Sequence, residues 1–259
     1  MTHHLNKDAI KAAEAHAREV FPQESCGVIV DGRYIRCKNI ADDPTLDFVM
    51  DPAEYKAALM KGKVEAVVHS HPNGPFFPSQ ADMQGQLDTD VPWAIIVLDD
   101  ERIASEPTVW GGDTPIPPVI GRQFLHGVTD CYSLIRDFFR LGKDELAKQG
   151  IPDWPFDPID MEDYARADEW WAGEDDLYVT QPPKWGFVEI KQHEIRAGDV
   201  FFVKIREERF KKFNHAGVYL GNNLIAHHLP GRLSRREPAS LWGRQAGKWM
   251  RYVGKPDAA

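Results

Sequence analysis

The feature that most constrains this chain is a pair of histidines two residues apart at the end of an apolar run. Residues 66–68 read Ala-Val-Val, and residues 69–72 read His-Ser-His-Pro. If both stretches continue one strand, His69 and His71 point to the same face, because side chains alternate along a strand. A loop rich in Pro and Gly follows at residues 73–78. We therefore expect two imidazoles close together at the end of a buried strand.

A carboxylate follows this loop at a spacing that can complete a metal site. Ser79 is a favourable helix N-cap, and Asp82 falls in the first turn of the expected helix, where its carboxylate can turn back toward the histidines. Two neutral imidazoles, one carboxylate and a position left for water are the ligand set of a catalytic zinc. A Ser-x-x-Asp cap similar to a capping box is the structural alternative. It does not explain two histidines on one face.

The spacing of these residues resembles the signature of the JAMM metallopeptidases, a zinc isopeptidase family that includes deubiquitinases. The resemblance implies that His69, His71 and Asp82 bind one zinc ion and that Ser79 hydrogen-bonds the oxyanion or the bound water. It also implies that Glu24 is the general base, because Glu24 opens a Glu-Ser-Cys-Gly sequence typical of the family. Such a carboxylate takes a proton from water and passes it to the leaving amine.

Strands and helices are expected to alternate around this motif. An amphipathic helix is predicted at residues 7–20, and a helix capped by Asp51 is predicted at residues 51–59. A turn that leads into a short buried strand is predicted at residues 23–30, and strands are predicted at residues 33–40 and 93–98, the last as a continuous apolar run. This interleaving predicts an α/β sandwich for residues 1–108, and the resemblance to JAMM-type domains implies that its sheet is mixed.

Composition limits the remaining possibilities. The chain has 259 residues, which favours two domains of average size. Residues 1–118 contain 10 Lys and Arg against 19 Asp and Glu, whereas residues 119–259 contain 21 of each, so we expect no nucleic-acid partner. The three cysteines argue against a disulfide framework. We find no signal peptide and no run of roughly 20 apolar residues, and therefore expect a cytosolic chain without a membrane span.

A join between two domains is predicted at residues 109–119. This stretch contains paired glycines and three prolines and shows no periodicity. Beyond it, a helix is expected to open at Asp130 or Cys131, with an apolar stripe that includes Leu134 and Phe138. A cysteine at a helix N-terminus gains thiolate character from the helix dipole. Taken alone, a cysteine in such a place is more often a packed core residue than a nucleophile.

Two histidines that could serve this cysteine lie in a predicted hairpin. Residues 214–221 and 224–228 predict strands, and the Asn-Asn pair between them predicts the turn. Pairing of these strands can place His227 beside His215. His228 competes with His227 for this position, because strand register decides which of the two points inward.

The second half of the chain resembles the NlpC-type cysteine peptidases, which cleave stem peptides of bacterial cell walls. The resemblance rests on the order of four motifs: Asp-Cys-Tyr-Ser-Leu, Gly-Asp-Val-Phe-Phe, His-Ala-Gly-Val-Tyr and a later His. The resemblance implies a papain-like α+β fold for residues 120–259. It implies that Cys131 is the nucleophile, that His215 is its base and that His227 fixes the imidazole tautomer. A packed cysteine and two hairpin histidines are the structural alternative.

One insertion departs from a minimal NlpC-type domain. Residues 157–176 carry nine acidic residues and one basic residue, together with Trp170 and Trp171. Our first interpretation is a solvated helix face; a lid that excludes substrate or a docking surface for another subunit is the alternative. The basic C-terminal part, from Arg232 to Lys255, could contact an acidic partner or this insertion.

A JAMM-type domain followed by an NlpC-type domain is the arrangement of the tail assembly protein K family of long-tailed bacteriophages. The resemblance implies a virion component at the tail tip, with other tail proteins as partners and host peptidoglycan as substrate when the genome enters the cell. A structural tail protein with silent sites is one alternative. A bacterial isopeptidase acting on ubiquitin-like proteins is the other.

Overall fold

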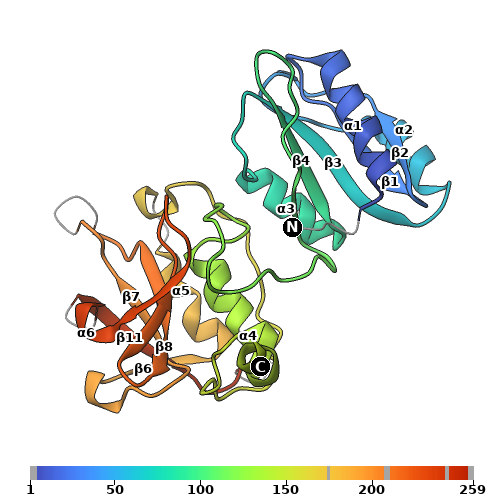
Figure 1. Ribbon diagram of the computed structural model, residues 1–259. Coiled ribbons are helices and arrows are strands. Elements are labelled where there is room, and N and C mark those ends of the chain that lie inside the picture. The colour runs from blue at the N-terminus through green and yellow to red at the C-terminus, as the bar shows by residue number, and fades with distance from the viewer. Residues whose placement is uncertain (1–4, 174–175, 207–210, 243–244, 256–259) are drawn as a thin grey trace. The chain divides into compact units, whose positions relative to one another are not determined.

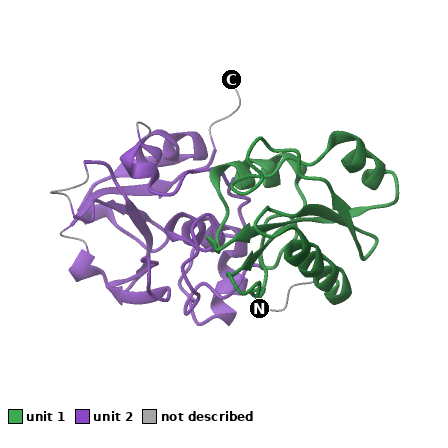
Figure 2. Ribbon diagram, turned by 90° about the horizontal axis from the view of Figure 1, so that it is seen from above, with its two compact units in different colours: residues 1–115 green, residues 116–259 purple. Residues whose placement is uncertain are grey.

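The computed structural model describes residues 5–173, 176–206, 211–242 and 245–255. The chain divides into two compact units, residues 1–115 and residues 116–259 (Figure 1; Figure 2). Each unit has its own sheet and its own hydrophobic core. No helix in the described part of the chain combines the length and the hydropathy that crossing a membrane requires.

The first unit is built on a five-stranded mixed sheet in the order β2-β1-β3-β4-β5. β3 and β4 are parallel to each other, and the pairs β1-β2, β1-β3 and β4-β5 are antiparallel. The central strands are buried on both faces, as their continuous apolar runs require. The strands are β1 (Cys26–Val30), β2 (Arg33–Cys37), β3 (Val64–Pro72), β4 (Trp93–Leu98) and β5 (Thr108–Trp110).

Alternation along β3 separates the core of this unit from its polar site. α1 (Lys7–Val20) packs its apolar stripe on the face that contains Ala66 and Val68. His69 and His71 point to the opposite face, where α3 (Gln80–Thr89) begins. The remaining helix, α2 (Pro52–Leu59), starts at the predicted N-cap Asp51. The sequence therefore predicted the α/β layering of this unit correctly.

The second unit contains a six-stranded antiparallel sheet in the order β10-β9-β8-β7-β11-β6. α4 (Cys131–Lys148) packs Leu134, Phe138 and Phe139 against this sheet, which confirms the predicted α+β class. The strands are β6 (Phe187–Ile190), β7 (Val200–Val203), β8 (His215–Gly221), β9 (Leu224–His227), β10 (Arg235–Pro238) and β11 (Ala246–Tyr252). The short helices are α5 (Leu177–Thr180), α6 (Ala239–Trp242) and the 3-10 turns Trp170–Ala172, Pro182–Trp185 and Gln192–Glu194.

The insertion at residues 157–176 corrects one interpretation of the sequence. A solvated helix face was expected, but residues 157–169 form no helix, and Met161 and Arg166 are buried. The reason is a row of basic side chains along α4, which pair with the acidic side chains of the insertion. The pairs are Arg136 with Asp163, Arg140 with Asp160 and Lys143 with Asp157. Residues 174–175 lie outside the described part of the chain.

Within the described residues, the basic C-terminal part forms an ion pair with this insertion. Lys255 Nζ lies 2.8 Å from Glu162 Oε1. Arg235 instead pairs with Glu237 on its own strand, and Arg236 donates to the carbonyl of Gln149. The basic residues were expected to contact either an acidic partner protein or this insertion, and Lys255 contacts the insertion.

Candidate active sites

Two histidines lie side by side at the end of β3. The Nε2 atoms of His69 and His71 are 3.1 Å apart, and both rings are buried. Phe48 stacks on the His69 ring at a centroid distance of 4.6 Å, while Trp93 contacts the same ring edge-on. This packing holds both imidazoles with their Nε2 atoms directed at one point.

Asp82 adds a carboxylate from the first turn of α3. The Ser79 Oγ atom accepts from the Asp82 N–H at 3.1 Å, and the Ser79 N–H donates to Asp82 Oδ2 at 2.8 Å. Asp82 Oδ1 lies 3.3 Å from His69 Nε2, and Oδ2 lies 3.6 Å from His71 Nε2. Burial opposes ionisation of Asp82, but the histidines and Ser79 outweigh it and hold the pKa of this carboxyl well below its usual range. The capping box and the ligand cluster therefore coexist.

The residues of this cluster fit a zinc ion. His69, His71 and Asp82 bring three ligand atoms within 4.8 Å of one another. The Pro75 carbonyl can only accept, so His71 Nδ1 donates to it at 2.7 Å and His71 Nε2 keeps a free lone pair. His69 Nδ1 is buried without a hydrogen-bond partner among the described residues, so the polar neighbours of this ring lie on its Nε2 side. Two imidazole nitrogens and a carboxylate oxygen are donors that zinc accepts.

Glu24 lies beside this cluster, just before β1. Its Oε1 atom is 4.0 Å from His71 Nε2. Burial raises the pKa of Glu24 to about 7, against the opposing effect of His71. A cavity of ≈ 360 Å³ opens onto Glu24, His71, Ser79 and Asp82. The four side chains therefore share one solvent-filled space in which a substrate could meet them.

A residue that sequence reasoning missed holds Glu24 in this place. Ser70 lies between the two histidines and points to the other face of β3. Its Oγ atom accepts from the Ser25 N–H at 2.8 Å, and the Ser70 N–H donates to the Ser25 carbonyl at 3.0 Å. These bonds tie the segment that carries Glu24 to the strand that carries the histidines. The sequence signal was the alternation itself, which sends Ser70 away from the ligands.

In the second unit, α4 begins at Cys131, one of the two starts that were predicted, and Asp130 is its N-cap. Asp130 Oδ1 accepts from the Ser133 N–H at 2.8 Å, and Oδ2 accepts from the Gly127 N–H at 2.9 Å. The Ala216 backbone lies close enough to the Cys131 thiol to lower its pKa, which places the thiol near the start of β8. Burial, together with the Asp130 charge, raises the pKa of the Cys131 thiol to about 11. The thiol is therefore protonated at neutral pH in this conformation.

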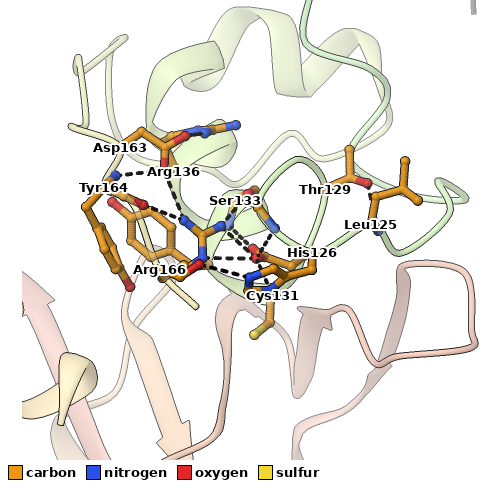
Figure 3. A network of polar contacts seen from close by, with 12 residues as sticks. Leu125, His126, Thr129, Cys131, Ser133, Arg136, Asp163, Tyr164 and Arg166 are labelled. Atoms are coloured by element: carbon orange, nitrogen blue, oxygen red, sulfur yellow. Dashed lines mark hydrogen bonds and ion pairs between the residues drawn. The ribbon is translucent and has the colours of Figure 1, made fainter. Parts of the chain in front are cut away.

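Arg166 compensates the buried charge of Asp130. Figure 3 shows Arg166 within a polar network that includes Ser133, Asp163 and Tyr164. Its Nε and Nη2 atoms donate to Asp130 Oδ2 at 3.1 and 2.6 Å, and Nη2 also donates to Ser133 Oγ at 3.2 Å. The guanidinium lies over the rings of Tyr132 and Tyr164, at 5.0 and 5.2 Å from their centroids. Arg166 thereby attaches the insertion to the N-terminus of the helix that carries Cys131. In the sequence, its signal is a single positive charge inside an acidic run.

The hairpin of β8 and β9 brings His215 and His227 together. Asn222 and Asn223 form its turn with φ values of 50° and 61°, a conformation that asparagine tolerates. His215 Nε2 lies 3.0 Å from His227 Nδ1. His228 points elsewhere, with its Nε2 atom 3.1 Å from the Arg232 carbonyl. The register therefore places His227, and not His228, beside His215.

Two further residues contact this site and were not expected from the sequence. The Tyr178 hydroxyl lies 3.3 Å from Cys131 Sγ, and Tyr178 itself is fully buried in the core. Glu237 Oε2 lies 3.2 Å from His227 Nε2. Tyr178 belongs to a segment without a periodic signal. Glu237 carries a signal only once β10 is known to pair with β9.

Comparisons with known proteins identify a family for each of the two domains. The Prok-JAB family, prokaryotic homologs of the JAB domain, matches residues 6–109, and the NlpC/P60 family matches residues 105–246. Tail tip assembly protein K of Escherichia phage N15 is 31% identical over 257 residues, which covers 96% of each chain. The lambda protein of the same name is 32% identical over 205 residues, covering 78% of this chain and 85% of its own. Protein DSY2949 from Desulfitobacterium hafniense, a solved structure, is 28% identical, covers 40% of this chain and 79% of its own, and gives a TM-score of 0.34.

These matches confirm the family that the motifs implied. The two domains follow one another in the expected order, and the similarity to the N15 protein extends over nearly the whole length of both chains. This chain therefore belongs to the family of phage tail tip assembly proteins K, with a Prok-JAB domain followed by an NlpC/P60 domain.

Proposed function

We propose that this protein is a component of a phage tail tip and that its second unit hydrolyses peptide bonds of host peptidoglycan when the phage genome enters the cell. The observation that carries the proposal is Cys131 at the start of α4, close to the backbone of Ala216, the residue that follows His215; His215 in turn is paired with His227. The names of the N15 and lambda relatives support a place in the tail, among other tail proteins. The chain would be made in the host cytoplasm and act at the cell wall.

Hydrolysis would proceed through an acyl-enzyme. His215 takes the thiol proton as Cys131 Sγ attacks the peptide carbonyl, and the C–S bond forms. His215 then gives this proton to the leaving amine as the C–N bond breaks. Water, activated by the same imidazole, cleaves the thioester and restores the thiol. His227 holds His215 in one orientation throughout.

Access to Cys131 would require a movement of the segment that carries Tyr178. The tyrosine hydroxyl contacts the sulfur, and Cys131 is only 9% exposed. The segment 177–185 would therefore act as a lid that keeps the thiol closed. It directly follows the acidic insertion at residues 157–176, for which a lid was one of the alternatives. Release of the lid on assembly into the tail would limit hydrolysis to the moment of infection.

For the first unit we propose a zinc-dependent peptidase or isopeptidase. His69, His71 and Asp82 would hold the ion, which supplies a Lewis acid for polarising a carbonyl and activating water. Glu24 accepts a proton and returns it to the leaving amine, for which its pKa of about 7 is well suited. The Ser79 hydroxyl faces the cavity and can donate a hydrogen bond to a developing oxyanion.

The burial of Cys131 favours one competing function, a structural tail-tip protein in which the cysteine site is silent. Digestion of purified peptidoglycan, with muropeptides resolved by mass, distinguishes the two. Wild type, Glu24→Ala and the matched thiol control Cys37→Ala should release stem-peptide fragments, and Cys131→Ala should release none. Release by Cys131→Ala would refute the proposal. Absence of release by every form, including tail-assembled protein, would establish the structural function.

A further inference from the structure

We propose that Glu237 is a positioning residue that sets the tautomers of His227 and His215 and so directs the basic nitrogen of His215 toward the thiol. The proposal rests on the cysteine-peptidase function proposed above for Cys131. It extends the pair of histidines to a chain of three groups that ends on a carboxylate. No metal or other cofactor is needed for this chain to form.

Strand pairing places the carboxylate against the outer nitrogen of His227. β10 pairs antiparallel with β9, with Arg235 opposite His227. Glu237 is two residues further along and therefore points to the same face, as a diagonal neighbour of His227. Its Oε2 atom lies 3.2 Å from His227 Nε2, and the carboxylate side chain is 17% exposed. This contact is thus built into the register of the sheet.

The direction of each hydrogen bond follows from the carboxylate. The 3.2 Å contact is an ion-pair distance, and His227 Nε2 has no other polar partner among the described residues. An ionised carboxylate can only accept and stabilises a proton on the nitrogen that faces it, so we place the proton of His227 on Nε2. In a neutral imidazole the other nitrogen is then bare, and His227 Nδ1 accepts from His215 Nε2 across 3.0 Å. His215 Nδ1 is left without a proton. It is the nitrogen that remains to take one from Cys131.

Two neighbours hold the carboxylate in its ionised form and in place. Trp242 Nε1 donates to Glu237 Oε2 at 2.6 Å, and Arg235 pairs with the other oxygen. The Trp242 ring packs on His227 at a centroid distance of 4.5 Å and on His215 at 5.4 Å. Partial burial opposes ionisation of Glu237, but these groups outweigh it and lower its pKa. A negative charge at the end of the chain also stabilises the imidazolium that forms when His215 takes the thiol proton.

Histidine ¹⁵N NMR of the full-length protein tests the tautomers directly. Wild type should show His227 protonated on Nε2, with Nδ1 bare. Glu237→Leu should lose this preference, whereas Glu237→Gln should keep it because the amide oxygen still accepts. Glu189→Gln on β6, which removes an exposed carboxylate paired with Lys248, is the matched control and should change nothing. Trp242→Phe keeps the ring and loses the N–H, and should give an intermediate shift if Glu237→Leu does not fold.

Activity provides the second readout. The rate of Cys131 alkylation by iodoacetamide and the rate of muropeptide release should fall about 10–100-fold in Glu237→Leu, the usual loss for a group that orients a site residue. Glu237→Gln should recover part of both rates. Unchanged His227 tautomers in a folded Glu237→Leu protein would overturn the proposal. If Glu237→Leu changes the tautomers but wild type releases no muropeptides, the positioning role of Glu237 is retained and only the hydrolase function is refuted.

Discussion

The histidines of the two candidate sites have different hydrogen-bond and ion-pair partners. In the first unit, the Nε2 atoms of His69 and His71 face each other and Asp82 at 3.1–3.6 Å, an arrangement suited to a cation at their centre. In the second unit, His215 and His227 form a directed chain that ends on Glu237. One site thus calls for a ligand to complete it. In the second site, the polar groups have one another as partners and no added ligand is required. The cost in folding free energy there is the burial of charges such as Asp130.

Removing the general base His215 should cause the largest loss of activity. His215→Ala should lower muropeptide release on the order of 10⁴-fold or more, because removal of one member of a nucleophile–base pair inactivates both. His228→Gln is the matched control: it alters the adjacent buried histidine, which contacts Arg232 instead. Its release rate should stay close to that of wild type. Equal losses in both variants would show that folding, and not proton transfer, was impaired.

Removing the partner of Asp130 should produce the largest change in stability. Arg166→Met leaves a carboxylate that is 3% exposed without its guanidinium, which costs about 3–5 kcal/mol in unfolding free energy. Hydrogen exchange of the α4 amides in the full chain measures this loss. Arg236→Met, an exposed arginine, should change it by about 0.5 kcal/mol or less. Adding Asp130→Asn to Arg166→Met should recover part of the loss; no recovery would refute the charge explanation.

Giving solvent access to the Cys131 thiol should raise its reactivity, by a smaller factor than the loss expected for His215→Ala. Burial raises the pKa of Cys131 to about 11, so the thiolate is scarce below that pH. Tyr178→Ala should let water reach the sulfur and move its pKa toward the ordinary value of about 8.5. Alkylation at pH 8 should then accelerate about 100-fold, and the midpoint of its pH profile should fall. Tyr178→Phe removes only the hydroxyl, whose hydrogen bond lowers the thiol pKa, so it should not accelerate alkylation. An unchanged rate in Tyr178→Ala would rule out the lid.

Zinc should stabilise the first unit alone. At a free concentration 100 times its dissociation constant, a bound ion adds about 2.7 kcal/mol to the unfolding free energy. Hydrogen exchange of β3 amides with and without zinc measures this gain, and β8 amides provide the internal control. His69→Ala should abolish the gain, whereas His193→Ala, an exposed histidine of the second unit, should keep it. A gain that survives in His69→Ala would place the ion elsewhere.

The smallest expected effect is on stability and comes from the capping box of α3, in which Ser79 pairs with the candidate metal ligand Asp82. Ser79→Ala removes the acceptor of the Asp82 N–H and should cost about 1 kcal/mol of stability. Thermal unfolding of the zinc-free protein measures this cost. Ser79→Asp, another favourable N-cap residue, should restore the stability. Failure of the aspartate to do so would mean that the cap contributes little to this helix.

Much of both sites could be predicted from the sequence because their signals are local. Alternation along β3 pairs His69 with His71, and the N-cap preference of Ser79 sets the start of α3. The start of α4 was predicted to within one residue. The choice of His227 over His228 required the register of a hairpin. Without knowledge of that pairing, both histidines were equally suitable.

The remaining residues act through contacts distant in sequence. Arg166 reaches Asp130 across 36 positions, and Tyr178 reaches Cys131 across 47. The acidic insertion was misinterpreted because its partners, the basic side chains of α4, lie in another segment. Neither periodicity nor spacing reports such pairs, since both describe only neighbours along the chain.

The most direct test of two chemically independent sites is muropeptide release by the full-length protein before and after removal of metal with a chelator. We predict the same rate in both states, and complete loss after treatment of the metal-free protein with iodoacetamide, because the chain from Cys131 to Glu237 contains no metal ligand of the first unit. Loss of release on chelation, with recovery on adding zinc, would contradict the account. It would place wall hydrolysis in the zinc site.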